Sequence, residues 1–248
     1  LQVNVPGHGV QVTDSAGQFT VDITNPTPIT VVVDGIHHQL IAGASAPSAS
    51  ATLQPGVNAT IQLLPATASD AEIAHTTCSL WTHQANEFAR SILGNTPPMT
   101  LADTVFPTVN IASACNAYYT GNTINFYSPG GNCTNMAAGS VVAHEWGHGL
   151  DDQHGGISQT HGLSEGWADI VSMYLFDDPT IGPGFFTNGA GIRTGLNTQQ
   201  YPPPAEVHAA GEVWMGFAWK FRENLRAVSG TAAARLISDT VVLGSIAA

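Results

Sequence analysis

The stretch "VVAHEWGHGLDDQH", residues 141–154, carries three histidines within eleven positions of a chain that has only ten. His144 and His148 lie four residues apart, so on a helix both imidazoles project from one face. Two imidazoles one turn apart span one side of a tetrahedral zinc ion at ~2.0–2.1 Å each. Glu145 is offset round the helix, where it can accept a proton from water at the metal. The stretch therefore predicts a helix over 139–153 that carries a metal site.

A third ligand would distinguish a metal site from a merely polar helix face, and the sequence offers two candidates. His154 follows His148 by six residues, the spacing of the HExxHxxGxxH metzincins, but Asp151 stands where that pattern has glycine. Glu165 lies in "GLSEGWAD", with Asp169 one helical turn later on the same face. Asp169 would accept the free N–H of a ligand histidine and fix its tautomer. We favour Glu165 and keep His154 as the alternative.

Composition limits the class of protein and its partners. The chain has 248 residues, 43% of them hydrophobic, enough for one substantial core or two smaller ones. Its 18 acidic and 6 basic residues give a net charge of −12, which disfavours nucleic acid and anionic membrane surfaces as partners. No apolar run approaches the ~20 residues of a membrane span. The low lysine content and many small polar residues are typical of a secreted protein, and we expect any signal peptide to have been removed.

The periodicity of the chain changes near Ser69. Residues 1–66 contain no lysine or arginine and alternate in segments such as "ITVVVDG", which predicts a β-rich accessory segment, a small sandwich or an N-terminal sheet. His37 and His38 are adjacent on a predicted strand, so their side chains should face opposite sides of it and should not bind the same metal ion. Beyond Ser69 the apolar spacing predicts helices at 70–93, 139–153, 163–176, "PPAEVHAAGEVWMGFAWKFRENLRAV" and "TAAARLISDTVVLG". The expected class is α+β, with residues 67–248 as the second, mainly helical domain.

The three cysteines are too few for a disulfide scaffold. Cys115 and Cys133 flank "NAYYTGNTINFYSPGGN", which is typical of two short strands around a turn at residues 120–122. A hairpin brings such ends together, so we predict a Cys115–Cys133 disulfide that contributes ~3 kcal/mol. Two buried thiols are the alternative. Cys78 falls in a helical pattern and is expected to be a core thiol.

Three motifs in order carry a family resemblance. "HEWGHG", "GLSEGWAD" and "AEVHAAGEVW" resemble the fungalysin-type metallopeptidases, relatives of thermolysin among the gluzincins. Upstream, "NAYYTGNTINFY" resembles the thermolysin-type edge strand that lies along the substrate. The similarity spans residues 75–243 and implies a zincin, thermolysin-like catalytic domain whose helical C-terminal lobe is shortened. Residues 1–66 carry no motif of this family.

The resemblance implies a secreted zinc endopeptidase that acts on proteins or peptides. His144, His148 and Glu165 would hold the zinc ion, which lowers the pKa of bound water to about 7. Glu145 would act as the general base, and His208 would stabilise the oxyanion of the transition state. A non-catalytic secreted protein with a structural or vestigial zinc site is the alternative from another class.

Further roles are implied for residues around the cleft. Asn116 and the backbone of Ala117 would pair with an extended substrate chain. The second ring nitrogen of His208 would be held by Glu206 or Glu212, and Glu212 has the better helical spacing.

Two expectations concern charged residues near the site. Arg193, in "GIRTG", would either bind a substrate carbonyl or form a structural salt bridge. Thermolysin-like enzymes often bind calcium, and the adjacent acidic residues Asp151-Asp152 and Asp177-Asp178 are candidates. Calcium requires six to eight converging oxygens, so solvated acidic loops are the favoured explanation of these pairs.

Overall fold

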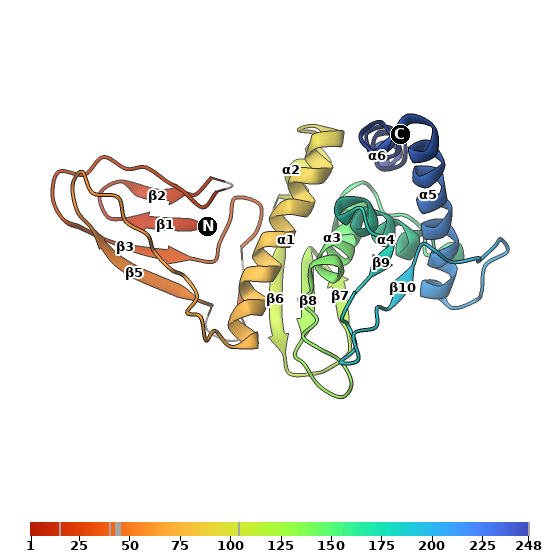
Figure 1. The fold of residues 1–248 in the computed structure, drawn as a ribbon, viewed down its shortest axis with the longest axis horizontal. Coiled ribbons are helices and arrows are strands. Elements are labelled where there is room, and N and C mark those ends of the chain that lie inside the picture. Colours follow the sequence, from red (N-terminus) through yellow and green to blue (C-terminus); the bar gives the residue numbers. More distant parts are fainter. Residues whose placement is uncertain (15, 40, 43–45, 104, 248) are drawn as a thin grey trace.

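The chain begins with a four-stranded antiparallel sheet of order β2-β1-β3-β5 (Figure 1). The computed structural model describes residues 1–14, 16–39, 41–42, 46–103 and 105–247. The four strands are β1 (Gln2–Val5), β2 (Gly9–Val12), β3 (Thr27–Val32) and β5 (Ser48–Leu53). Successive side chains of a strand point to opposite faces, so alternate apolar residues gather on one side. That face forms a small core of its own, built on Val3, Val5, Ile29 and Val31.

A second sheet, of order β4-β6-β8-β7, lies in the rest of the molecule. Its strands are β4 (Ile41–Ala42), β6 (Phe106–Ile111), β8 (Thr123–Tyr127) and β7 (Ala117–Thr120). The first three run parallel, and β7 is an antiparallel edge strand. The predicted hairpin joins β7 to β8 through Gly121 and Asn122, both with positive φ, as a two-residue turn requires. Since β4 precedes β5, the chain crosses into the second sheet once before residue 66.

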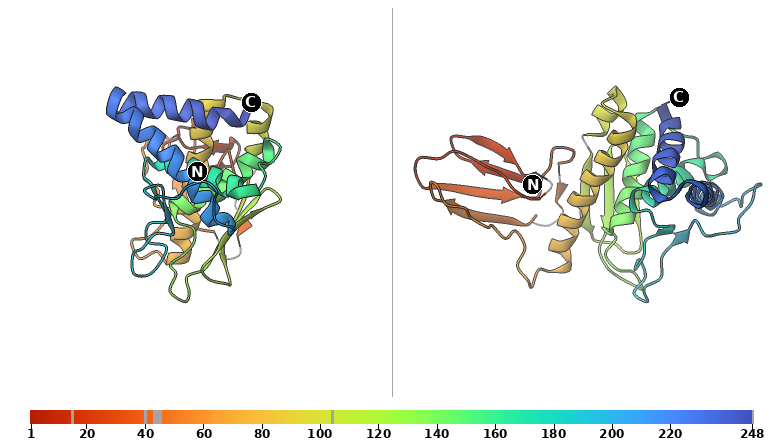
Figure 2. Two further views of the ribbon diagram at one scale, coloured as in Figure 1. Left: turned by 90° about the vertical axis from the view of Figure 1, so that its right-hand side faces the viewer. Right: turned by 45° about the horizontal axis from the view of Figure 1, so that its top comes forward.

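Helix α1 (Asp70–Leu93) lies between the two sheets (Figures 1 and 2). It begins at a capping box in which the Ser69 hydroxyl accepts a hydrogen bond from the Glu72 amide, and the Glu72 carboxylate accepts one from the Ser69 amide. It ends at Gly94, as predicted, and the two prolines that follow open α2 (Pro97–Ala102). Cys78 is fully buried in α1, and burial raises the pKa of its thiol to about 12.

Four further helices build the far side of the molecule from the first sheet (Figures 1 and 2). They are α3 (Gly139–Gln153), α4 (Leu163–Phe176), α5 (Val207–Ser229) and α6 (Thr231–Val242). Turns of 3-10 helix lie at Thr160–Gly162 and Leu243–Ala247, and a short ribbon pairs β9 (Thr180–Ile181) with β10 (Arg193–Thr194). All four helices fall where the sequence pattern predicts them. Within the described residues, no helix is both long and apolar enough to cross a membrane.

Glycines bring α3, α4 and α5 into close contact. A Cβ added to Gly147 on α3 would lie 3.0 Å from the Ala168 Cα atom of α4. A Cβ on Gly166 of α4 would lie 2.9 Å from the Gly211 carbonyl oxygen of α5, and one on Gly211 would lie 2.8 Å from the Gly166 amide nitrogen. Such separations leave no space for a side chain between the backbones. The helices are therefore fixed close together where they carry the predicted site residues.

Candidate metal centre

Helices α3 and α4 bring His144, His148 and Glu165 together. The Nε2 atoms of His144 and His148 each lie 3.5 Å from Oε2 of Glu165. Ligand atoms of a tetrahedral zinc ion with ~2.0–2.1 Å bonds lie about 3.4 Å apart, so these separations fit the ion. The two imidazole rings meet edge to face with centroids 4.8 Å apart.

The carboxylate of Glu165 is prepared for a cation. Its Oε1 atom accepts a hydrogen bond from the side-chain amide of Gln159. The buried Oε2 atom accepts no hydrogen bond from the described residues. Burial alone would raise the pKa of Glu165, but the contacts with His144 and His148 hold that pKa well below its usual range. Two imidazoles and an ionised carboxylate with a free, buried oxygen are the donor set that zinc prefers.

Asp169 links the first ligand to Arg193. Its Oδ1 atom lies 2.8 Å from Nδ1 of His144, and Arg193 donates two hydrogen bonds of 2.8 Å to the same carboxylate. Burial alone would raise the pKa of this fully buried carboxyl group, but Arg193 and His144 lower it. The ionised carboxylate therefore orients the His144 ring, as expected for a residue behind a metal ligand. Of the two roles considered for Arg193, the salt bridge is present in the structure.

The other imidazole has a support that the sequence analysis missed. Nδ1 of His148 lies 3.3 Å from the Ser164 hydroxyl, which donates a 2.9 Å hydrogen bond to Asp151. The Ile157 amide donates to the second oxygen of Asp151. Ser164 precedes a ligand directly and Asp151 lies three residues after one, so a search for polar groups adjacent to the motif would have found both.

Glu145 faces the same space as the ligands. Its carboxylate lies within 4.8 Å of the ligand nitrogens of His144 and His148. The side chain is 6% exposed, and burial raises its pKa above the ordinary value despite the two nearby imidazoles. Glu145 and His144 both line a cavity of about 500 Å³. A carboxylate with a raised pKa beside a metal is well suited to take up and release a proton.

His208 reaches the centre from the start of α5. Its Nε2 atom lies 3.5 Å from Oε2 of Glu165, and its side chain is 49% exposed toward the cavity. Its Nδ1 atom lies 2.7 Å from Oε1 of Glu206, so the preference for Glu212 on helical spacing was wrong. Side chains on a helix lean toward its N-terminus, which turns His208 toward the N-cap residue Glu206 and away from Glu212.

His154 does not join the ligands. It is the C-cap residue of α3, and its Nδ1 atom lies 2.8 Å from the Leu150 carbonyl oxygen. The structure therefore brings Glu165, and not His154, to the imidazoles of His144 and His148: α3 ends at Gln153, and the His154 ring turns back onto the helix.

The cavity continues from the metal centre to the edge strand β7. Asn116 and Ala117 line it, and β7 is the outer strand of its sheet, with one edge free for a further strand within the described part of the chain. The cavity also has an apolar wall, which consists of Val141, Ile181, Phe185, Phe186 and Ile192. None of the lining residues belongs to the first 66 positions.

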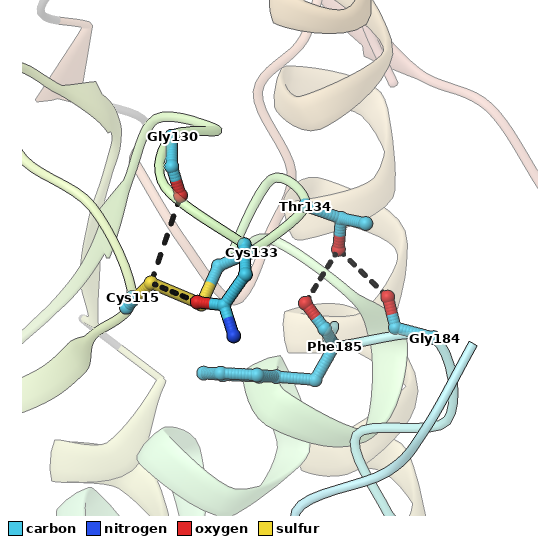
Figure 3. Close-up of a disulfide and its surroundings, with 7 residues drawn as sticks. Cys115, Gly130, Cys133, Thr134, Gly184 and Phe185 are labelled. Carbon is cyan, nitrogen blue, oxygen red and sulfur yellow. Dashed lines mark hydrogen bonds between the residues drawn. A yellow bond between two sulfur atoms is a disulfide. The ribbon is translucent and has the colours of Figure 1, made fainter. Parts of the chain in front are cut away.

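A disulfide lies in the lining of the cavity, and Figure 3 shows its surroundings. Cys115 and Cys133 are bonded, as predicted, and both line the cavity. The Thr134 hydroxyl donates hydrogen bonds to the carbonyl oxygens of Gly184 (2.8 Å) and Phe185 (3.2 Å), so the bridge also steadies the apolar wall. Figure 3 shows these contacts side by side, next to the chain that enters β7.

The acidic pairs proposed for calcium are engaged elsewhere. Asp151 supports Ser164, and Asp152 accepts a 2.6 Å hydrogen bond from the Tyr119 hydroxyl. Asp177 forms ion pairs with Arg222 and Arg226, and Asp178 accepts a hydrogen bond from the Thr180 amide. Neither pair belongs to a group of converging ligands in the described residues, and we propose no calcium site.

The chain shares its overall fold with a solved metalloproteinase precursor. Among solved structures, the chain is similar to the precursor of protealysin, a metalloproteinase from Serratia proteamaculans, with a TM-score of 0.53 and 14% sequence identity. The similarity covers 86% of this chain and 87% of that one. No family model and no curated protein matches the chain.

Proposed function

We propose that this protein is a secreted, zinc-dependent endopeptidase of the fungalysin type. The observation that carries the proposal is the 3.5 Å distance from the Glu165 carboxylate to the imidazoles of both His144 and His148, next to a buried Glu145 that lines the same cavity as His144. The similarity of the fold to a metalloproteinase precursor supports it. A disulfide next to the cleft and a composition poor in lysine support an oxidising, extracellular setting.

The side chains supply the proton transfers of peptide hydrolysis. Zinc held by the three ligands would polarise the substrate carbonyl and lower the pKa of an attacking water molecule to about 7. Glu145 accepts the proton of that water and then delivers it to the leaving nitrogen. Its burial makes both steps feasible, because a raised pKa brings the carboxyl group closer to neutral pH.

His208 stabilises the negative charge that develops on the carbonyl oxygen. Its Nε2 atom is turned to the metal centre, and Glu206 accepts from Nδ1 on the opposite side of the ring. The contact with Glu206 holds the ring with Nε2 directed at the position where the oxyanion would form. Glu206 is also the N-cap of α5 and accepts from the amides of His208 and Ala209, which fixes its position.

The substrate would be an extended peptide that adds to the edge strand β7. Asn116, exposed at the start of this strand, and the backbone of Ala117 are placed to bind its main chain. The apolar wall, with Phe185 and Ile181 at its core, favours an apolar substrate side chain next to the scissile bond. Arg193 also lines the cavity, where its ion pair with Asp169 limits its movement.

An internally quenched peptide with blocked termini tests the activity. Hydrolysis of this substrate requires cleavage within the chain, so it identifies an endopeptidase. We expect cleavage that a chelator abolishes and that added zinc restores, monitored by fluorescence and by mass spectrometry of the products. A protein that binds zinc and cleaves none of a diverse peptide library would instead support the non-catalytic zinc protein.

Replacement of His208 by alanine tests the oxyanion role. We expect kcat to fall on the order of 10²–10³-fold, as for loss of a single oxyanion donor, with little change in KM. Metal content and thermal stability should be unaffected, because the ring is half exposed and lies outside the proposed ligand set of His144, His148 and Glu165. Steady-state kinetics on the quenched peptide measure the effect.

The conservative variant Glu206→Gln is the matched control for this role. It keeps a capping oxygen near the amides of α5 but removes the charge beside Nδ1. A loss smaller than that of His208→Ala is expected. A His208→Ala variant that loses metal, or that keeps its full kcat, would assign His208 another role.

A further inference from the structure

A second group of metal-ligating side chains lies where the segment after β3 packs against α1. His83 and Glu87 are one turn apart on α1, and His37 comes from that segment. One ligand atom from each residue lies within 4.8 Å of the other two. The group is separate from the catalytic cavity, which none of these residues lines.

The second group has the same donor set as the first but a different arrangement of the rings. The rings of His37 and His83 are stacked, with centroids 5.2 Å apart and an interplanar angle of 15°, whereas those of His144 and His148 meet edge to face at 4.8 Å and 88°. Nε2 of His37 lies 2.7 Å from Oε1 of Glu87. The second group thus also contains two imidazoles and one glutamate, and a histidine nitrogen again faces the carboxylate.

The support behind the second group also resembles that of the first. Oδ1 of Asp103 lies 3.0 Å from Nδ1 of His37, and Arg90 forms an ion pair with the same carboxylate oxygen. This is the order Arg–Asp–His found for Arg193, Asp169 and His144. An aspartate fixed by arginine holds the ring of His37 with Nε2 directed at the other two side chains, as carboxylates behind metal ligands do.

We propose that His37, His83 and Glu87 bind a second zinc ion, with Asp103 as the positioning residue. Two imidazoles and a carboxylate are ligands for zinc, and water completes a fourth position. On binding, the proton between Nε2 of His37 and the Glu87 carboxylate is released to solvent, and zinc takes its place. The 2.7 Å separation then widens to about 3.4 Å. Glu87 can make this movement because its side chain is 48% exposed, which also gives the ion access.

The ion would attach the N-terminal part of the chain to α1. His37 is 7% exposed and the adjacent His38 is 4% exposed, and both face α1 rather than opposite sides of a strand. Nε2 of His38 lies 2.7 Å from the Ser79 hydroxyl, which is one turn before His83. The two histidines therefore lie along one face of α1, and only His37 comes close to His83 and Glu87. Zinc here would hold the first sheet against the rest of the protein.

Metal counting on the full chain tests the proposal. After removal of metal with a chelator and reloading with zinc, elemental analysis should find two zinc ions per chain in the wild type and one in Glu165→Ala. Adding Glu87→Gln or His83→Ala to Glu165→Ala should remove the remaining zinc. Adding His8→Ala, an exposed histidine of the first sheet, should not. Zinc should also raise the Tm of Glu165→Ala, and Glu87→Gln should remove this rise.

Comparing Glu165→Ala with and without a substitution in the second group distinguishes the two proposed metal sites. If Glu165→Ala keeps both ions, the first centre has been assigned wrongly, yet loss of one ion on adding Glu87→Gln still supports the second. Equal zinc content with and without both Glu87→Gln and His83→Ala would overturn the second site. Glu87→Gln is nearly isosteric and exposed, so its effect is separable from misfolding, which circular dichroism monitors.

Discussion

The variant Glu145→Gln should bind metal and fold like the wild type, but turn over substrate ~10²–10⁴-fold more slowly, the usual contribution of a positioned general base. Glutamine has nearly the shape of glutamate, so the buried pocket around residue 145 stays filled. It has no carboxylate to accept the proton of the attacking water. Steady-state kinetics and elemental analysis on the same preparation measure both quantities.

The fate of the metal decides how this result is interpreted. A loss of turnover with a full metal complement places the effect on proton transfer. Turnover within a few fold of the wild type would eliminate Glu145 as the base. A loss of metal would instead make Glu145 a ligand, because its carboxylate lies within 4.8 Å of the ligand nitrogens.

The paired variants Glu165→Ala and His154→Ala should differ by one bound metal ion. Glu165→Ala removes the oxygen that lies 3.5 Å from both imidazoles, so its chain should lose the ion of the catalytic centre and all peptidase activity. His154→Ala should keep its full metal content and most of its activity, because its ring contacts the Leu150 carbonyl instead. Elemental analysis after dialysis compares the two proteins directly.

The opposite pair of results would reverse the assignment. Metal lost from His154→Ala and kept by Glu165→Ala would make the site metzincin-like, with the end of α3 rearranged around the ion. The His154 variant also serves as the control for Glu165→Ala, since each removes one polar side chain close to α3.

The parts of the site that lie on one helix could be predicted from the sequence. The four-residue spacing of His144 and His148, and that of Glu165 and Asp169, places each pair on one helix face whatever surrounds it. The hairpin of β7 and β8 could also be predicted because it depends only on neighbouring residues. Gly121-Asn122 provides the turn that brings Cys115 and Cys133 together.

Contacts between distant segments could not be derived in this way. Glu212 was preferred to Glu206 as the partner of His208, because only the direction of His208 on the folded helix decides which carboxylate it meets. The partners of the acidic pairs could not be predicted, because Tyr119 and two arginines reach these pairs from other elements. The His37 group was missed because Glu87 is 50 residues away and the expected strand at His37 is absent from the described structure.

The backbone contact between α4 and α5 separates the parts of the cleft that can vary from those that cannot. Glu165 and His208 stand on either side of the Gly166–Gly211 contact, where a Cβ at Gly166 would lie 2.9 Å from the opposing carbonyl oxygen. With no side chain between the helices, no change of rotamer there can adjust the separation of the two backbones that carry the proposed metal ligand and the proposed oxyanion donor. Mutation can therefore reshape the apolar wall at Phe185 and Phe186, and with it the choice of substrate we propose, while the separation of these two backbones stays constant.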